Sequence, residues 1–168
     1  MKAETQDRMK AALSDAVLSG TSASVLSAAV LSTFSKIEEG SAAGGLNGPS
    51  QWIYGEEAGY AREASLKQTG VGYGIHHTTS IFWATFYEYF CGRSNGDRLQ
   101  RITPGQVMIE AVTMATGAYV VDYGLTPKRL QPGFDKHISP GGMVATYAAF
   151  AAGLAITTLL RQRKANAS

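Results

Sequence analysis

Four long, apolar stretches with few charges constrain the fold of this chain more than any other feature of its sequence. Ala16–Phe34 has nineteen residues without a charge, Val71–Tyr87 has seventeen and Gly141–Leu160 has twenty. The third stretch along the chain, Gly105–Leu125, differs because it contains two acidic residues. A helix that crosses a bilayer needs about 17–25 predominantly apolar residues. The stretches therefore predict membrane-spanning helices.

We predict an all-α fold, a bundle of four transmembrane helices that forms a single integral membrane domain over residues 1–168. The predicted spans are residues 12–34, 70–90, 105–125 and 141–161, and residues 35–69 form a periplasmic loop. Charged residues make up 17% of the chain, below the roughly 25% that is usual in globular proteins. The mean hydropathy is only -0.06, because the spans are rich in Ala, Gly, Ser and Thr.

The basic residues predict the orientation. Lys and Arg in short segments near the ends of the spans favour the cytoplasmic side. Nine of the fifteen basic residues lie at the two termini and in the segment after the second stretch, although the last loop also contains basic residues. We therefore predict a multi-pass protein of the bacterial inner (cytoplasmic) membrane with both termini in the cytoplasm. The nine residues are Lys2, Arg8, Lys10, Arg93, Arg98, Arg101, Arg161, Arg163 and Lys164.

Two other interpretations of the apolar stretches stay open. The first stretch follows basic residues, as the apolar core of a signal peptide does, and Ser41–Ala43 supplies small residues for cleavage. Asp15 and the length of the stretch disfavour this interpretation. A soluble helical bundle is the second alternative, because the stretches are only modestly hydrophobic. Such a bundle would be recovered from the cytosol without detergent.

Small side chains recur on one face of the first and fourth stretches. Such residues let helix backbones approach each other closely in lipid, so the pattern favours helix packing. A wide polar pore is the alternative. The residues are Ala16, Gly20, Ser24 and Ser27 in the first stretch, and Ala145, Ala149, Ala152 and Gly153 in the fourth.

Ionisable residues concentrate in the second and third stretches. A short loop joins these stretches, which predicts antiparallel neighbours in which residues at equal depth have a constant sum of residue numbers. One register places His76, beside His77, opposite Asp122, and the same register sets Glu88 level with Glu110. Ionisable groups inside a membrane are costly and often functional. The cluster is either structural, with each Glu paired with an arginine, or a proton or cation site.

The loops contain candidate interface residues. Trp52 suits the aromatic belt of a membrane surface. Residues Glu56–Lys67 have a helical composition, and Lys128 with Arg129 is a candidate contact for lipid phosphates or for acidic residues of the loop 35–69.

Three segments of the chain carry a resemblance. They are NGPSQWIYG at 47–55, GYGIHHTTSIFWATFYE at 72–88 and VDYGLTPKRLQPGFDKHIS at 121–139. They resemble segments of uncharacterised small inner-membrane proteins of proteobacteria. The resemblance covers most of the chain and implies the membrane topology and the bacterial setting. It implies no activity and no catalytic residues.

The sequence favours a structural or accessory membrane protein without catalytic residues, cofactor or metal. It has one cysteine and no CxxC, HExxH or phosphate-binding glycine motif, and no basic stripe of the kind that binds nucleic acid. The expected partners are the lipid bilayer and a second copy or another membrane protein. A proton- or cation-coupled transporter or channel subunit is the alternative. A haem protein is disfavoured, because His137, which would have to oppose His76 or His77, lies in a loop.

Overall fold

The computed structural model describes residues 2–91 and 101–166, and this part of the chain is helical, with no strand. Its long helices are α1 (Lys2–Glu39), α4 (Val71–Cys91), α6 (Pro104–Tyr119) and α7 (Pro140–Asn166). They occupy the positions of the four apolar stretches. A π-helical turn, η5 (Val120–Leu125), continues α6 to the end that the sequence predicts. Arg93 and Arg98 lie outside the described residues.

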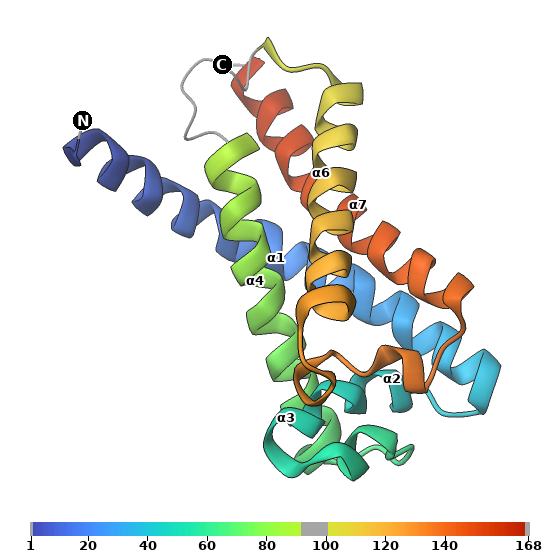
Figure 1. Cartoon of the computed structure of the whole chain (residues 1–168). Helices are drawn as coiled ribbons and strands as arrows, with labels where there is room; N and C mark the ends of the chain where they lie inside the picture. The colour runs from blue at the N-terminus through green and yellow to red at the C-terminus, as the bar shows by residue number, and fades with distance from the viewer. Residues whose placement is uncertain (1, 92–100, 167–168) are drawn as a thin grey trace.

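Short helices and turns form a cap at one end of the long helices, opposite the end that bears both termini (Figure 1). The predicted helical stretch Glu56–Lys67 is not one helix, because a 3-10 helix covers only Glu56–Tyr60 and an extended segment follows it. The other cap elements after α1 are α2 (Gly44–Asn47), η1 (Gly48–Ser50), α3 (Gln51–Tyr54) and η3 (Leu66–Gly70). Those before α7 are η6 (Lys128–Leu130) and η7 (Phe134–Lys136).

Local sequence signals explain where helices begin and end. Gly40, with a positive φ of 84°, follows the last residue of α1, as glycine commonly does after a helix. Thr103 and Gln106 form a reciprocal capping box at the start of α6, and Pro104 occupies its first turn. These signals fix the length of the helices independently of a membrane.

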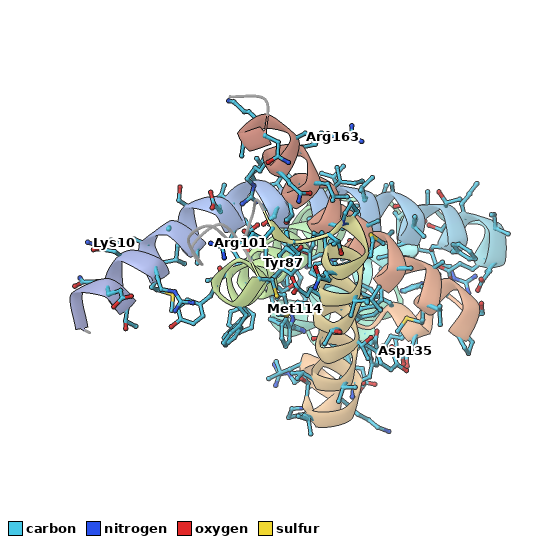
Figure 2. All side chains as sticks on the ribbon, turned by 90° about the horizontal axis from the view of Figure 1, so that it is seen from above. Lys10, Tyr87, Arg101, Met114, Asp135 and Arg163 are labelled. Atoms are coloured by element: carbon cyan, nitrogen blue, oxygen red, sulfur yellow. The ribbon has the colours of Figure 1, made fainter. Side chains whose placement is uncertain are left out.

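The helix α1 is the centre of the packing. It packs against α4 and α7, whereas α6 packs chiefly against α7 (Figure 1). Figure 2, which looks down on the molecule, places Tyr87 and Met114 centrally and Lys10, Asp135 and Arg163 at the periphery. The prediction of α4 and α6 as antiparallel neighbours is met in part, because the two helices are in contact but α4 packs more extensively against α1 and α6 against α7.

The predicted small-residue face of α1 is confirmed. Ala16, Gly20, Ser24 and Ser27 are all buried. A Cβ atom on Gly20 would lie 2.6 Å from Cα of Ile81 in α4, so only glycine allows this approach.

The predicted small-residue face of α7 is only partly buried. Gly153 lies directly against the backbone of Ala23 in α1. Ala145, Ala149 and Ala152 are half-buried. The helix therefore turns a slightly different face towards α1 than the small residues alone indicate.

Two helices are apolar enough over a sufficient length to cross a membrane: α1, between Glu4 and Glu39, and α7, over Pro140–Asn166. The helices α4 and α6 do not meet this measure, because α4 contains several polar side chains and α6 has only 16 residues.

We expect Gly20→Ala to destabilise the fold. The added methyl group must push α4 away from α1, and overpacking of this kind costs about 1–3 kcal/mol. Unfolding by a graded increase of denaturing detergent would measure the loss. The matched control is Gly117→Ala in α6, where a Cβ atom meets no atom within 4 Å. The control should be neutral or stabilising by up to about 1 kcal/mol, and equal losses in both variants would contradict the packing described here.

Candidate functional site

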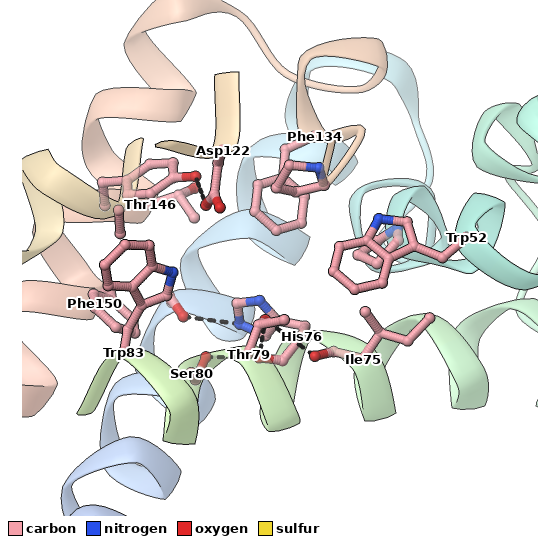
Figure 3. A pocket seen from close by; sticks show the side chains of 15 residues that line it. Trp52, Ile75, His76, Thr79, Ser80, Trp83, Asp122, Phe134, Thr146 and Phe150 are labelled. Carbon is pink, nitrogen blue, oxygen red and sulfur yellow. Dashed lines mark hydrogen bonds between the residues drawn. The ribbon is translucent and has the colours of Figure 1, made fainter. Parts of the chain in front are cut away.

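A pocket lies where α4, α7 and η5 meet the cap, and we call it the cap pocket (Figure 3). Its cavity volume is about 50 Å³, and it is partly open to solvent. The helix α4 contributes a face that contains His76 and Trp83. The side chains that matter most for its chemistry are Trp52, His76, Trp83, Asp122, Phe134 and Tyr147.

His76 forms one wall of the cap pocket and is held in place by α1. Its Nε2 lies 3.0 Å from Oγ of Ser27, and Ser27 Oγ lies 2.7 Å from the carbonyl oxygen of Ala23, to which it donates. Since that serine proton is engaged, the contact favours a proton on Nε2. The ring of Phe134 meets His76 edge-on, with centroids 5.6 Å apart. The imidazole is thus fixed in orientation.

Asp122 lies on another wall of the same pocket (Figure 3). The hydroxyl of Tyr147 donates to its Oδ2 at 2.7 Å. The predicted register thus brings His76 and Asp122 to one pocket. Within the described part of the chain, no hydrogen bond or ion pair joins them.

A second polar cluster lies at the other end of the bundle, where α1, α4 and α7 meet. The guanidinium of Arg161 donates two bonds to the carboxylate of Glu88, at 2.9 and 2.5 Å, and reaches Asp15 at 3.2 Å. Glu88 is fully buried. A bidentate pair of this kind combines charge with fixed geometry. We call these three residues the ion triad.

The triad includes residues that the sequence argument missed. Arg161 and Asp15 flank the fourth and first stretches, and the predicted orientation puts both on the same side of the membrane. This shared side was the feature of the sequence from which contact between Arg161 and Asp15 could have been predicted. Glu110 lies half-buried on α6, and the arginine that makes the bidentate contact with Glu88 comes from α7.

A third cluster ties the cap to α1. Nδ1 of His137 lies 2.6 Å from the carboxylate of Glu39, and its Nε2 donates to the carbonyl of Gly59 at 2.6 Å. Arg62 contacts the same carboxylate at 3.0 Å. These contacts join the end of α1, the middle of the cap and the segment between η7 and α7. The cap is therefore a fixed part of the fold.

The remaining predicted residues do not join these clusters. His77 is half-buried and lies beside the ring of Tyr73, at 5.9 Å between centroids. Lys128 and Arg129 are exposed on η6. Trp52 makes a loop contact, since its indole nitrogen donates to the carbonyl of Gln131 at 3.2 Å.

Comparisons with protein-family models, curated proteins and solved structures found no match to this chain. The described residues contain no group of three or more His, Cys, Asp or Glu side chains placed to hold a metal ion. The function is therefore argued from the arrangement of the residues themselves.

We expect Arg161→Met to destabilise the protein strongly. The change leaves the buried Glu88 without its bidentate partner, and loss of one member of a buried ion pair costs roughly 3–5 kcal/mol. Detergent unfolding of the purified variant would measure the change. Arg163→Met, at an exposed position of the same helix, is the matched control and should shift stability by no more than about 0.5 kcal/mol. A small effect at both positions would show that the triad is not structural.

Proposed function

We propose that this chain is an integral protein of a bacterial inner membrane, with four spans, both termini in the cytoplasm and the cap in the periplasm. We further propose that it acts as an accessory or structural protein of that membrane. The observation that carries the proposal is the distribution of side chains: large apolar groups lie on the outside of the long helices, and many small or polar groups lie inside.

The outer surface of the long helices is apolar. Leu18 of α1, Phe90 of α4 and Ile109 of α6 are exposed to 61%, 61% and 67%, and Val144 of α7 to 72%. Monomeric soluble proteins rarely expose contiguous apolar patches of large size. A surface of this kind on every long helix supports contact with lipid, including for α4 and α6.

Much of the inner surface is formed by small and polar groups, beside larger apolar side chains such as Leu154. Ser19, Ser24 and Ser27 of α1 are buried, and so are Thr158 of α7 and the charged Glu88. Small and polar groups at these positions contribute less hydrophobic stabilisation in water than large apolar side chains would. In a bilayer, helices associate instead through small residues and hydrogen bonds between helices. The interior therefore supports the same assignment.

The chain termini support the proposed orientation. The basic residues of both ends lie opposite the cap, and positive residues near spans favour the cytoplasmic side.

The contacts of the ionisable residues support a structural role. The triad joins α1, α4 and α7, and Glu39 with His137 joins the cap to α1. These groups hold elements together.

Reporter fusions test the topology. We expect alkaline phosphatase to be active when fused after Lys67 or Asp135, and a fluorescent protein to be bright after Arg101 or at the C-terminus, in a membrane fraction that resists carbonate extraction. A fluorescent signal at every site in a soluble product would overturn the proposal. Two spans formed by α1 and α7 alone would place the fusion after Arg101 on the same side as the one after Lys67.

A proton- or cation-coupled transporter subunit is the second candidate, and the presence of His76 and Asp122 on one pocket favours it. The cap pocket and the ion triad, however, are separated along the helices by buried apolar side chains, among them Ala84 in α4 and Leu154 in α7. Such a layer opposes the passage of ions.

We therefore expect liposomes that contain the purified protein to keep an imposed pH gradient or potassium gradient as long as empty liposomes do. A dye inside the vesicles would report the pH. A leak that disappears in Asp122→Asn and persists in Asp135→Asn would instead establish the transport function and contradict the purely accessory one.

A further inference from the structure

The cap pocket contains a carboxylate without a cationic partner. Tyr147 donates to one oxygen of Asp122. Within the described residues, no nitrogen of Lys, Arg or His lies within 4.0 Å of either oxygen. Asp122 is half-buried. The carboxylates of Glu88 and Glu39, in the other two clusters, have basic partners, whereas the contact that holds Asp122 is a neutral hydroxyl.

Most hydrogen-bond donors around the pocket are already engaged. Trp52 donates to the carbonyl of Gln131. The hydroxyls of the pocket wall each donate to a carbonyl one turn earlier in the same helix, at 2.7–3.0 Å; they belong to Ser27, Thr79, Ser80 and Thr146. Apart from the indole N–H of Trp83, the pocket therefore offers acceptors, and a matching ligand supplies donors or positive charge.

Aromatic rings form much of the remaining wall. Figure 3 shows Trp52 and Trp83 on opposite sides of the pocket, with Phe134 and Phe150 also facing it. The faces of such rings attract cations, and aromatic cages with an acidic group are a recurrent means of binding ammonium ions. A hard metal cation needs about six or more oxygen ligands, which a wall of rings does not supply.

We propose that the cap pocket binds a small organic ammonium ion, a primary or methylated amine. Its charge lies against Asp122 and its apolar part rests on Trp52 and Trp83. The amine is either a free solute or the headgroup of a phospholipid, since both present the same chemistry. The proposal goes beyond the accessory role and does not depend on the number of spans, because the walls of the pocket are formed within the fold itself.

Binding at this site can be followed by the intrinsic tryptophan fluorescence of the protein. Its two tryptophans, Trp52 and Trp83, both line the pocket, so their fluorescence reports occupation directly. The full chain, purified in a maltoside detergent that carries no amine, would be titrated with choline and with ethanolamine at constant ionic strength. We expect a saturable change in tryptophan fluorescence with each.

Two comparisons test recognition of the charge. The carbon isostere of choline, in which a tert-butyl group replaces the trimethylammonium group, should bind at least about tenfold more weakly. Asp122→Asn, which keeps an oxygen for Tyr147, should weaken choline binding by about tenfold or more. Asp135→Asn, at an exposed acidic position in the cap region, is the matched control and should leave the affinity within about twofold.

Several results would overturn the proposal. They are a failure of either amine to change the fluorescence, equal binding of the neutral isostere, equal loss in both aspartate variants, or an effect of sodium chloride as large as that of choline. If gel filtration and circular dichroism show that Asp122→Asn does not fold, the isostere comparison on the unmodified protein still tests whether the pocket recognises the positive charge.

Nanodiscs identify the source of the amine. In discs of phosphatidylcholine or phosphatidylethanolamine, a lipid headgroup in the pocket would compete with free choline and raise its apparent Kd relative to discs of phosphatidylglycerol. An unchanged Kd in all three lipids, with binding intact, assigns the site to a free amine. Either result supports ammonium recognition.

Discussion

The close approach of α1 to α4 and α7 is the constraint on which the rest of the structure depends. Between residues 12 and 28, every buried position of α1 is Ala, Ser or Gly. These side chains let two helices cross α1 at backbone contact, at Gly20 against Ile81 and at Ala23 against Gly153. Dispersion contacts at this range hold the three helices together along this part of α1.

The polar clusters follow from that approach. Glu88 and Arg161 are 73 residues apart in sequence and meet because α4 and α7 are both drawn against α1. Asp15, on α1 itself, completes the triad. The guanidinium thus lies where three backbones converge. The same convergence buries Glu88 completely, so its carboxylate must be satisfied by protein groups. Packing and electrostatics therefore depend on each other at this end of the bundle.

The sequence predicted the helices well because length and charge are local properties. It predicted the buried face of α1 for the same reason, since helical spacing places Ala16, Gly20, Ser24 and Ser27 together. The pairing of helices was harder to predict from the sequence, because loop length indicates only which helices can be neighbours. His76 and Asp122 share a pocket as the hairpin register implied, but their hydrogen-bond partners, Ser27 and Tyr147, come from helices that the hairpin did not include.

The cap pocket forms where large side chains meet, whereas the close contacts of α1 form where small side chains meet. Beyond Ala28 the small residues give way to Leu31 on α1, and the cap brings Trp52 and Phe134 over the helices. Rings of this size cannot approach as closely as Ala and Gly, so space remains between them. A space that resulted from packing alone would be lined by apolar groups, since a carboxylate there is costly to bury. Asp122, half-buried on that wall and bonded to Tyr147, is the polar group that the proposed ammonium ion would meet.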